Sequence, residues 1–404
     1  MSRFPGVSGL FRVGSLAALF LGTPLRAADS PYGINAHAPQ GADLAALFDA
    51  AKAARIGWVR IDFAWSAVER SPGDFDFSVY DALVSAAAAR GLSVYATLGS
   101  TPGWATDGPA LTGVPRSPAD FAAFCARASA RYGTGVAVWG FWNEPNLAVF
   151  WSGTRQQYID AILKPGADAI HAASPGARVA GPELANLVSN GAVWYRWLTD
   201  VIAQAGDRLD VVSHHVYGSS AAAVTAKLET PTVFGANPAY WDYISPSVKE
   251  VLEASGWLGK PFWLTETGWA SDQIGEDAQA AQITGLLNDW ATSQAGRAWL
   301  SHVFFYELVD DGTAGIPKWG ILRSDRTAKP AEAAYRSFIV VHTKGDVNGD
   351  GAIDVSDVFA LVNFLYSGGP PPVGIADLNA DGNVNVADVF YLASFLFAGG
   401  PPPK

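Results

Sequence analysis

Residues 136–146 read Val-Ala-Val-Trp-Gly-Phe-Trp-Asn-Glu-Pro-Asn. The run Val136–Trp142 is rich in branched and aromatic residues, which is typical of a β-strand. Pro145 has no backbone N–H to give to a sheet, so a central strand cannot continue through it. The stretch therefore predicts a strand that ends just before Pro145, with Glu144 at its carboxyl end.

Similar strand-like runs recur between Pro31 and about Val341, separated by Ala-rich stretches with helical spacing. The runs are Tyr32–His37, Trp58–Trp65, Leu92–Gly99, Val136–Trp142, Arg178–Gly181, Leu209–Tyr217, Phe262–Thr267 and His302–Leu308. Eight alternating strand and helix units predict an α/β fold of the (β/α)8 TIM barrel type. An open doubly wound sheet is the alternative, but it usually has a Gly-rich turn after its first strand, and the sequence has none there.

The composition suits a folded protein that does not bind nucleic acid. Of the 404 residues, 49% are hydrophobic and 16% are charged, which argues against a disordered chain. The formal net charge of -11 would repel a phosphate backbone. The single cysteine, Cys125, lies in an apolar helical stretch, so we expect it to be buried and to form no intramolecular disulfide.

The first 28 residues have the pattern of a secretory signal peptide. Arg3 and Arg12 supply positive charge, Val13–Gly22 is a short apolar run, and small residues follow at positions 27 and 28. Ten apolar residues are too few to cross a bilayer, and a membrane-anchoring helix is the alternative. We expect residues 1–28 to be removed, which leaves a secreted or cell-surface protein without a membrane span.

The sequence changes character at Lys344, and residues 345–404 contain a segment that repeats after 31 residues. In each copy, oxygen-bearing side chains occupy positions 1, 3, 5, 9 and 12 of a loop with Gly at position 6, and an apolar helix follows. Calcium prefers six to eight hard oxygen ligands, and the glycine allows the sharp turn. The predicted ligands, with a backbone carbonyl at position 7, are Asp346, Asn348, Asp350, Ala352, Asp354 and Asp357, then Asp377, Asn379, Asp381, Asn383, Asn385 and Asp388.

We therefore expect a small all-α module that binds two Ca²⁺ ions, neither of which is needed for catalysis. Two Asx-rich turns without metal are the alternative. The tail resembles a type I dockerin, and this resemblance implies docking to a cohesin-like receptor on a scaffold or cell surface. The pairs at loop positions 10 and 11, Val355-Ser356 and Val386-Ala387, depart from the Ser-Thr pattern common in that family, so a purely structural calcium module stays open.

Two glutamates occupy the ends of predicted strands four and seven. Glu144 precedes Pro145, and Glu266 precedes Gly268 at the end of Phe262–Thr267. In a (β/α)8 barrel, functional groups gather at the carboxyl ends of the strands. Two carboxylates that flank one cleft can hydrolyse a glycosidic bond, one as acid and the other as nucleophile or base. The tryptophans beside them would raise the pKa of one carboxyl by desolvation and so separate the two roles.

With Asn-Glu-Pro after strand four and a glutamate after strand seven, residues from about Pro31 to Phe338 resemble a clan A glycoside hydrolase. The stretch Trp142–Trp151 and Trp319-Gly320-Ile321-Leu322 are most similar to glycoside hydrolase family 39. The resemblance implies that Glu144 is the acid/base and Glu266 the nucleophile, with retention of configuration. It also implies that Asn143 hydrogen-bonds the substrate 2-hydroxyl group.

The resemblance extends to further positions of the barrel. Arg60 matches an arginine beneath the nucleophile, and His215 and Tyr217 match a His-x-Tyr motif in which the tyrosine steadies the nucleophile. Among the tryptophans, we expect Trp65, Trp269 and Trp319 to stack on sugar rings, although each alone is more often a core residue. Glu183 and Glu307 also lie near strand ends, but neither is part of a motif with a defined role.

The sequence thus predicts a signal peptide (1–28), a catalytic barrel (29–341) and a dockerin-like module (345–404). The predicted activity is retaining hydrolysis of β-glycosidic bonds in a polysaccharide or oligosaccharide, with the two carboxyl groups about 5–5.5 Å apart. A carbohydrate-binding protein without turnover and a transglycosylase are the alternatives.

Overall fold

The computed structural model describes the chain except residues 1–29, 38–42, 189–191, 234–243, 293–298 and 350–351. The predicted signal peptide therefore lies outside the described residues. Within the described ranges, no helix combines the length and the apolar character that crossing a membrane requires.

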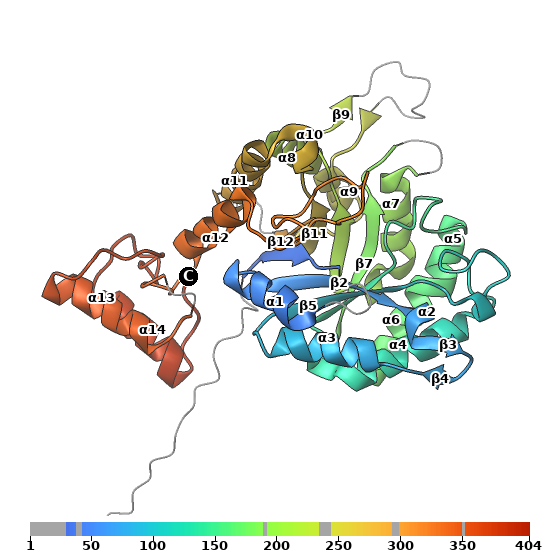
Figure 1. The fold of residues 1–404 in the computed structure, drawn as a ribbon, viewed down its shortest axis with the longest axis horizontal. Helices are drawn as coiled ribbons and strands as arrows, with labels where there is room; N and C mark the ends of the chain where they lie inside the picture. Colours follow the sequence, from blue (N-terminus) through green and yellow to red (C-terminus); the bar gives the residue numbers. More distant parts are fainter. Residues whose placement is uncertain (1–29, 38–42, 189–191, 234–243, 293–298, 350–351) are drawn as a thin grey trace, which may run out of the picture.

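Eight parallel strands close into a barrel in the order β1-β12-β11-β8-β7-β6-β5-β2 (Figure 1). Each strand corresponds to one of the eight predicted runs, so the prediction of a (β/α)8 barrel is confirmed. The strands are β1 (Tyr32–Asn35), β2 (Trp58–Ala64), β5 (Ser93–Gly99), β6 (Val138–Phe141), β7 (Arg178–Ala185), β8 (Val211–His215), β11 (Phe262–Thr267) and β12 (Leu300–Phe305).

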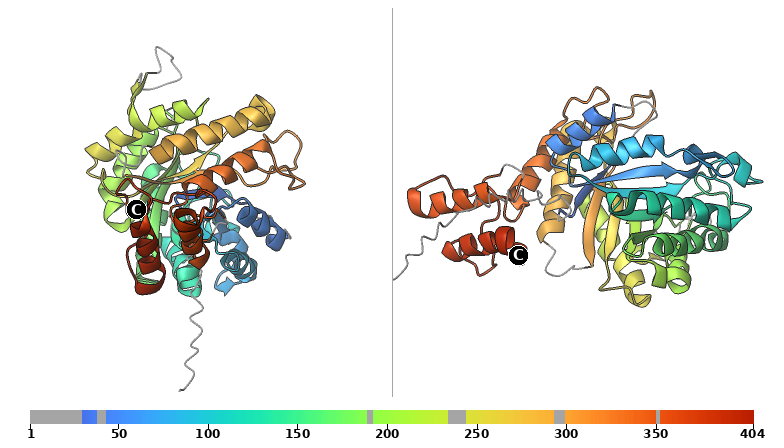
Figure 2. Two further views of the ribbon diagram at one scale, coloured as in Figure 1. Left: turned by 90° about the vertical axis from the view of Figure 1, so that its left-hand side faces the viewer. Right: turned by 90° about the horizontal axis from the view of Figure 1, so that it is seen from below.

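Helices surround the barrel on the outside (Figures 1 and 2). The longer ones are α1 (Leu44–Ala53), α3 (Ser78–Ala88), α4 (Pro118–Tyr132), α6 (Lys164–Ala173), α7 (Trp194–Ala205), α8 (Ala221–Glu229), α9 (Val248–Ala254), α11 (Glu276–Thr292) and α12 (Pro330–His342). The short elements are α2 (Trp65–Val68), α5 (Arg155–Tyr158), α10 (Ser271–Ile274) and the hairpin strands β3 (Glu69–Ser71), β4 (Asp74–Phe75), β9 (Thr232–Val233) and β10 (Ile244–Ser245).

Helix α4 illustrates why these segments fold as they do. It begins with Pro118 in its first turn, where a missing N–H costs nothing. Phe121, Phe124, Cys125 and Ala128 follow at helical spacing, and all four are fully buried. The prediction that Cys125 is a buried side chain without a disulfide is confirmed.

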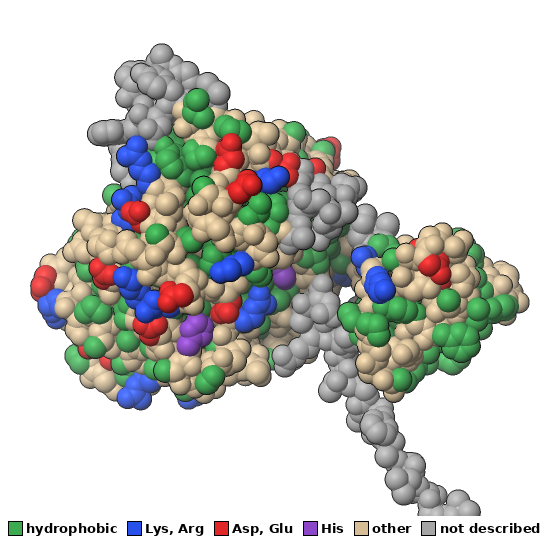
Figure 3. Space-filling model, turned by 180° about the vertical axis from the view of Figure 1, so that it is seen from behind, with side chains coloured by type: hydrophobic (Ala, Val, Ile, Leu, Met, Phe, Trp, Pro, Cys, Tyr) green, Lys and Arg blue, Asp and Glu red, His purple; other side chains and the backbone are tan. Residues whose placement is uncertain are grey.

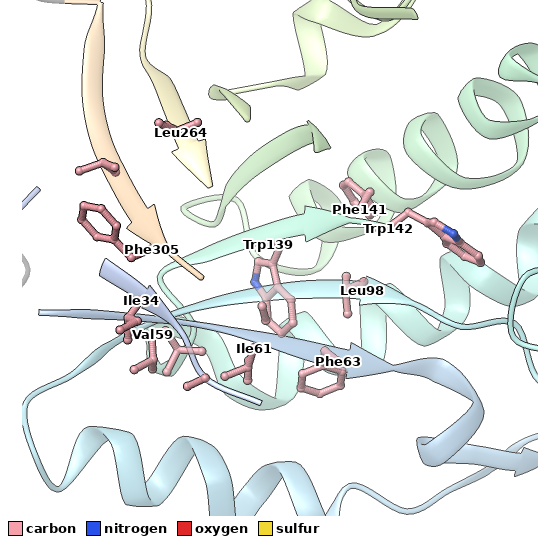
Figure 4. Close-up of a cluster of buried hydrophobic side chains, with 14 of the residues drawn as sticks. Ile34, Val59, Ile61, Phe63, Leu98, Trp139, Phe141, Trp142, Leu264 and Phe305 are labelled. Carbon is pink, nitrogen blue, oxygen red and sulfur yellow. The ribbon is translucent and has the colours of Figure 1, made fainter. Parts of the chain in front are cut away.

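Strand alternation divides the side chains of β2 between two environments. Val59, Ile61 and Phe63 point outward into the layer between the barrel and its helices (Figure 4). Trp58 points inward and closes the bottom of the barrel together with aromatic side chains such as Trp263. Arg60 is two residues further along the same inward face, so it lies above this apolar floor and closer to the carboxyl ends of the strands.

The tail consists of two loops, each followed by a helix, α13 (Val355–Ser367) or α14 (Val386–Ala398). Asp354 and Asn385 cap the two helices, which end at Gly368 and Gly399 in the left-handed conformation. Leu361, Leu378 and Leu392 are fully buried in a small core of the tail.

The tail lies beside α12, outside the ring of barrel helices (Figures 1 and 2). Arg55, just after the C-terminal end of α1, makes two hydrogen bonds to the tail. It donates to Asp346 Oδ2 at 3.3 Å and to the carbonyl oxygen of Gly349 at 2.6 Å.

Candidate active site

The two predicted glutamates meet at the carboxyl ends of the strands. Glu144 follows β6, and Glu266 lies on β11 beside His215 of the neighbouring strand. One carboxylate oxygen of each glutamate and a ring nitrogen of His215 lie within 4.8 Å of one another. The register of β11 shifts between Leu264 and Glu266. In a regular strand, Leu264 and Glu266 would face the same side, because they are two residues apart, and Leu264 faces the core outside the barrel. The register shift between them allows Glu266 to face the interior instead.

The backbone beside Glu144 takes unusual conformations. Trp142, Glu144 and Glu183 have positive φ values of 67°, 43° and 54°, which non-glycine residues rarely adopt. The N–H of Glu144 donates to the carbonyl oxygen of Glu183 at 3.0 Å and so ties the ends of β6 and β7 together. Such conformations cluster at functional sites, where the surrounding structure has to hold them.

Both carboxylate oxygens of Glu266 accept hydrogen bonds. Arg60 Nη1 donates to Oε1 at 2.7 Å, and the Tyr217 hydroxyl donates to Oε2 at 2.9 Å. Glu266 is only 7% exposed, so these bonds act in surroundings that contain little water. The two donors therefore fix the orientation of the Glu266 carboxylate.

Glu144 has different surroundings. Burial raises its pKa to about 7, and the charge of Arg60 opposes this only in part. His215 Nδ1 lies 3.1 Å from Glu144 Oε1 and 3.5 Å from Glu266 Oε2, between the two carboxyl groups. Burial lowers the pKa of His215 to about 4, so this imidazole is neutral at pH 7. The pair thus combines one hydrogen-bonded carboxylate with one carboxyl that holds a proton near neutral pH.

Arg60 joins the nucleophile candidate to a second buried carboxylate. Its guanidinium donates to Asn35 Oδ1 at 2.6 Å, to Asn143 Oδ1 at 3.0 Å and, from Nε, to Glu183 Oε2 at 3.1 Å. A further bond runs from Arg60 Nη2 to Glu183. The structure therefore brings the predicted residues Arg60, Asn143 and Glu266 into one network.

Glu183 and Asn35 complete this network, and the sequence did not predict their parts in it. Glu183 is fully buried and also accepts hydrogen bonds from the Tyr95 hydroxyl at 2.7 Å and from Thr97 Oγ1. The sequence Gly181-Pro182-Glu183 could have indicated a functional glutamate, because it places Glu183 directly after a proline near the end of a predicted strand. It could not indicate the partner, since Arg60 is 123 residues away in the sequence.

The three tryptophans that were predicted to stack on sugar rings differ in exposure and surroundings. Trp319 is half-buried, with its ring 5.4 Å from that of Tyr217, beside the carboxylate pair. The expectation for Trp65 is wrong: it is fully buried, its indole N–H donates to Glu69, and its ring packs among the outer helices. Trp269 is 4% exposed and donates to the Gly218 carbonyl oxygen, so the structure places it in the core as well.

A hollow of about 300 Å³ is lined by residues that include Trp142 and Asn143, which directly precede Glu144 in the sequence. Asp62, Thr97 and Asn143 supply polar groups to its wall, and Leu111 and Phe150 lie on its rim. Leu111 is 53% exposed and Phe150 is 38% exposed, so apolar surface is available in this hollow. A concave site with apolar surface and a few convergent polar groups is typical of a small-molecule or glycan site.

The loops of the tail have the donor chemistry of calcium sites. Asp357 and Asp388, at loop position 12, are fully buried and accept hydrogen bonds from the backbone N–H groups of Asp354 and Asn385. Burial raises the pKa of Asp357, so a nearby cation would stabilise its charged form. In the second loop, Gly382 has a φ of 87°, the conformation that the sharp turn needs. Asp350, a predicted ligand, lies outside the described residues.

The structure thus has a (β/α)8 barrel with two glutamates at the ends of its fourth and seventh strands, the arrangement that the resemblance to clan A glycoside hydrolases implies. Two family models match parts of the sequence. Residues 121–287 match the model of glycosyl hydrolases family 39, and residues 344–396 match the dockerin type I domain. The predicted resemblance to a family 39 barrel joined to a type I dockerin is thereby confirmed.

Two known proteins with similar sequences are named as β-glycosidases. A glucan 1,3-beta-glucosidase from Candida albicans is 29% identical over 105 residues, which are 23% of this chain and 34% of that protein. A beta-xylosidase from Geobacillus stearothermophilus is 33% identical over 97 residues, 22% of this chain and 18% of that protein. The matched region thus spans about a third or less of these relatives.

Among solved structures, a family 39 glycoside hydrolase from the gut symbiont Bacteroides cellulosilyticus WH2 has the same fold. The TM-score is 0.60 at 22% identity, and the match covers 76% of this chain and 63% of that one.

Proposed function

We propose that the barrel hydrolyses β-glycosidic bonds with retention of configuration. The observation that carries this proposal is the pair Glu144 and Glu266, whose nearest carboxylate oxygens are no more than 4.8 Å apart. Retaining enzymes separate their carboxyl groups by about 5–5.5 Å, whereas inverting enzymes need about 6.5–9.5 Å to fit a water molecule. The short distance supports a nucleophile rather than a base that activates water.

The surroundings of each carboxyl group suit its proposed role. Glu266, held in place by hydrogen bonds from Arg60 and Tyr217, attacks the anomeric carbon and forms a glycosyl-enzyme as the bond to the leaving sugar breaks. Glu144 holds a proton near neutral pH and gives it to the oxygen of the leaving sugar. In the second step, Glu144 takes a proton from water while the water oxygen bonds to the anomeric carbon. The bond from that carbon to Glu266 breaks, which releases the sugar and restores the carboxylate.

Neighbouring residues position the sugar for this reaction. Asn143 turns its Oδ1 toward Arg60, so its amide N–H groups are the part of the side chain that can donate to the 2-hydroxyl group. Trp319 offers a partly open ring face beside Tyr217, which suits stacking on a sugar. Neutral His215 helps to hold Glu144 and Glu266 in place. The names of the relatives support β-glucosides and β-xylosides as the first substrates to test.

The test is release of reducing sugar from a panel of neutral polysaccharides and aryl β-glycosides, with the chain beside its Glu266→Gln variant. We expect release by the unaltered chain and only background release by the variant. Product analysis with added acceptor sugars separates hydrolysis from transglycosylation. Binding without release by the unaltered chain would favour the carbohydrate-binding alternative, and equal release by both proteins would reject Glu266 as the nucleophile.

For the tail we propose two bound Ca²⁺ ions and docking to a cohesin-like domain of another protein. The specific observation is that α13 and α14 expose aromatic side chains at equivalent positions, and Figure 3 shows much hydrophobic surface on one face of the tail. Phe359 and Phe390 are 67% and 70% exposed, and Tyr366 and Phe397 follow at equivalent positions with 65% and 68% exposure. Exposed aromatic side chains at two matching places are costly unless a partner covers them.

This proposal includes secretion and the division of the chain into residues 1–28, 29–341 and 345–404. Both rest on the sequence pattern together with the type I dockerin match. N-terminal sequencing of the exported protein would test the cleavage site. Activity of a chain that ends at residue 341 would test whether the barrel works without the tail.

A further inference from the structure

A buried asparagine binds the loop that carries Glu144 to the neighbouring strand. Asn146, two positions after Glu144, is 6% exposed. Its Nδ2 donates to the carbonyl oxygens of Ala185 at 2.9 Å and Ala192 at 3.0 Å, and its Oδ1 accepts from the N–H of Ala185 at 3.0 Å. Both amide hydrogens and one lone pair of the amide oxygen therefore bind backbone groups.

The backbone partners of Asn146 connect this loop to the rest of the candidate active site. Ala185 is the last residue of β7, and it lies opposite His215 in the register of β7 and β8. His215 Nδ1 is 3.1 Å from Glu144 Oε1. Ala192 lies just before α7, at the other end of the loop that leaves β7. Asn146 thus joins the loop after β6 to the end of β7 and to the approach to α7.

Regular strand pairing does not make this connection. In the described part of the barrel, the paired register of β6 and β7 extends only as far as Trp139 and Val179, below the site. Nearer to the carboxyl ends, the N–H of Glu144 donates to the carbonyl oxygen of Glu183 at 3.0 Å. The three hydrogen bonds of Asn146 follow two residues later along the loop. The position of the loop relative to β7 therefore depends strongly on one side chain.

The loop needs such support because its backbone is strained. Trp142 and Glu144 have φ values of 67° and 43°, and residues in such conformations keep them only where the surrounding structure holds them. Pro145, between Glu144 and Asn146, has no N–H to donate. Without the side chain of Asn146, the loop would lose three of its bonds to the neighbouring backbone and could relax away from β7.

The nucleophile candidate is held by different contacts. Glu266 accepts hydrogen bonds from Arg60 and Tyr217, and neither donor is a hydrogen-bond partner of Asn146. Asn143, in the same loop as Asn146, has a separate anchor because its Oδ1 accepts from Arg60 at 3.0 Å. Loss of Asn146 should therefore displace the acid/base candidate and leave the nucleophile candidate in place.

We propose that Asn146 is a positioning residue that holds the carboxyl group of Glu144 at the oxygen of the leaving sugar. The proposal rests on the glycoside hydrolase function proposed above. Asn146 acts through Glu144 and so affects the proton transfers, not the attack by Glu266. A general acid works only within hydrogen-bond reach of the oxygen that it protonates, and a displacement of about 1 Å can lower the rate about 100-fold.

The test compares two substrates that differ in their need for a proton donor. We measure kcat/KM of Asn146→Ala with the phenyl and the 2,4-dinitrophenyl β-glycoside of a sugar that the unaltered chain cleaves. Phenolate leaves poorly without a proton, whereas dinitrophenolate is stable as an anion. We expect kcat/KM to fall by about 30- to 100-fold for the phenyl glycoside and by less than about threefold for the dinitrophenyl glycoside. Equal losses for the two substrates would overturn the proposal.

The matched control is Gln279→Ala, which removes another buried amide with three backbone partners. Gln279 Nε2 donates to the carbonyl oxygens of Trp269, Trp319 and Gly320, in the loops after β11 and β12. We expect this variant to lower kcat/KM by the same factor for both substrates. Asn146→Asp keeps the size but loses both donors, so it should repeat the pattern of Asn146→Ala, and thermal melts show that each variant is folded. A dependence on the leaving group as large in Gln279→Ala would contradict the proposal.

Hydrogen exchange of the backbone separates this proposal from the proposed function. Exchange is followed by mass spectrometry of peptides from the unaltered chain and from Asn146→Ala. We expect the peptide that contains Glu144 to exchange about tenfold faster in the variant, and the peptide that contains Glu266 to be unchanged. This result supports the positioning role even if no turnover is found. Unchanged exchange at Glu144, or equally faster exchange in both peptides, rejects it whatever the outcome of the activity test.

Discussion

Replacing Glu183 with glutamine tests the buried network beneath the nucleophile candidate. Glu183 is fully buried and accepts hydrogen bonds from Arg60, Tyr95 and Thr97. Glutamine keeps the shape and one acceptor but removes the charge that pairs with Arg60. Removing one partner of a buried ion pair costs about 3–5 kcal/mol, and we expect about 3 kcal/mol here because one acceptor remains. At roughly 2 °C per kcal/mol for a domain of this size, Tm falls by about 6 °C.

The same change weakens catalysis, because Arg60 also positions Asn143 and Glu266. We expect kcat/KM to fall by about 10- to 100-fold at a temperature well below Tm, in line with a displaced catalytic group. The matched control is Glu276→Gln on α11, whose side chain is 34% exposed and whose partner Arg323 is 42% exposed. That pair contributes less than about 1 kcal/mol. A Tm change of the same size in both variants, or unchanged kcat/KM in Glu183→Gln, would refute the reasoning.

The other predictions concern the acid, the tryptophans and the tail. Because the pKa of Glu144 is raised to about 7, its proton is lost as pH rises, so kcat/KM falls above about pH 7, and Glu144→Gln removes this alkaline limb from the pH profile. Trp65→Ala costs about 3–5 kcal/mol in denaturant unfolding, whereas Trp319→Ala leaves stability within about 1 kcal/mol of the unaltered chain and raises KM; equal stabilities would contradict this assignment. Chelation of Ca²⁺ lowers the helical circular dichroism of an isolated tail but leaves the barrel's activity unchanged, and a loss of activity would show that the barrel depends on the metal. Replacing Phe359 and Phe390 with serine leaves calcium binding intact and abolishes capture by an immobilised cohesin domain; undiminished capture would place the docking surface elsewhere.

The strands and the two glutamates could be predicted because their signals are local. Each barrel strand is a short apolar run, and Pro145 fixes where β6 ends. Glu144 and Glu266 follow from the rule that functional groups collect where parallel strands end. The dockerin-like tail could be predicted for the same reason, since the calcium-loop spacing repeats within the sequence.

The network beneath Glu266 could not be predicted in the same way. Glu183 acts through Arg60, and only closure of the barrel brings together two residues 123 positions apart. Trp65 shows a different limit, because residue type alone does not say which face a side chain occupies. Parity within the expected strand Trp58–Trp65 was the neglected signal, because Trp65 has the parity of the outward-facing Ile61 and Phe63. In the structure, α2 begins at Trp65, and its side chain stays on that outer side.

The central claim is that Glu266 becomes covalently bonded to the sugar during turnover. The most direct measurement is mass spectrometry of peptides after the chain reacts with a 2-deoxy-2-fluoro β-glycoside of the neutral sugar that it cleaves. The double-displacement mechanism predicts one fluorosugar per chain, attached to the peptide that contains Glu266, and no attachment in Glu266→Gln. Attachment to another carboxylate such as Glu307, or continued turnover of ordinary substrate with inversion and no adduct, would contradict it.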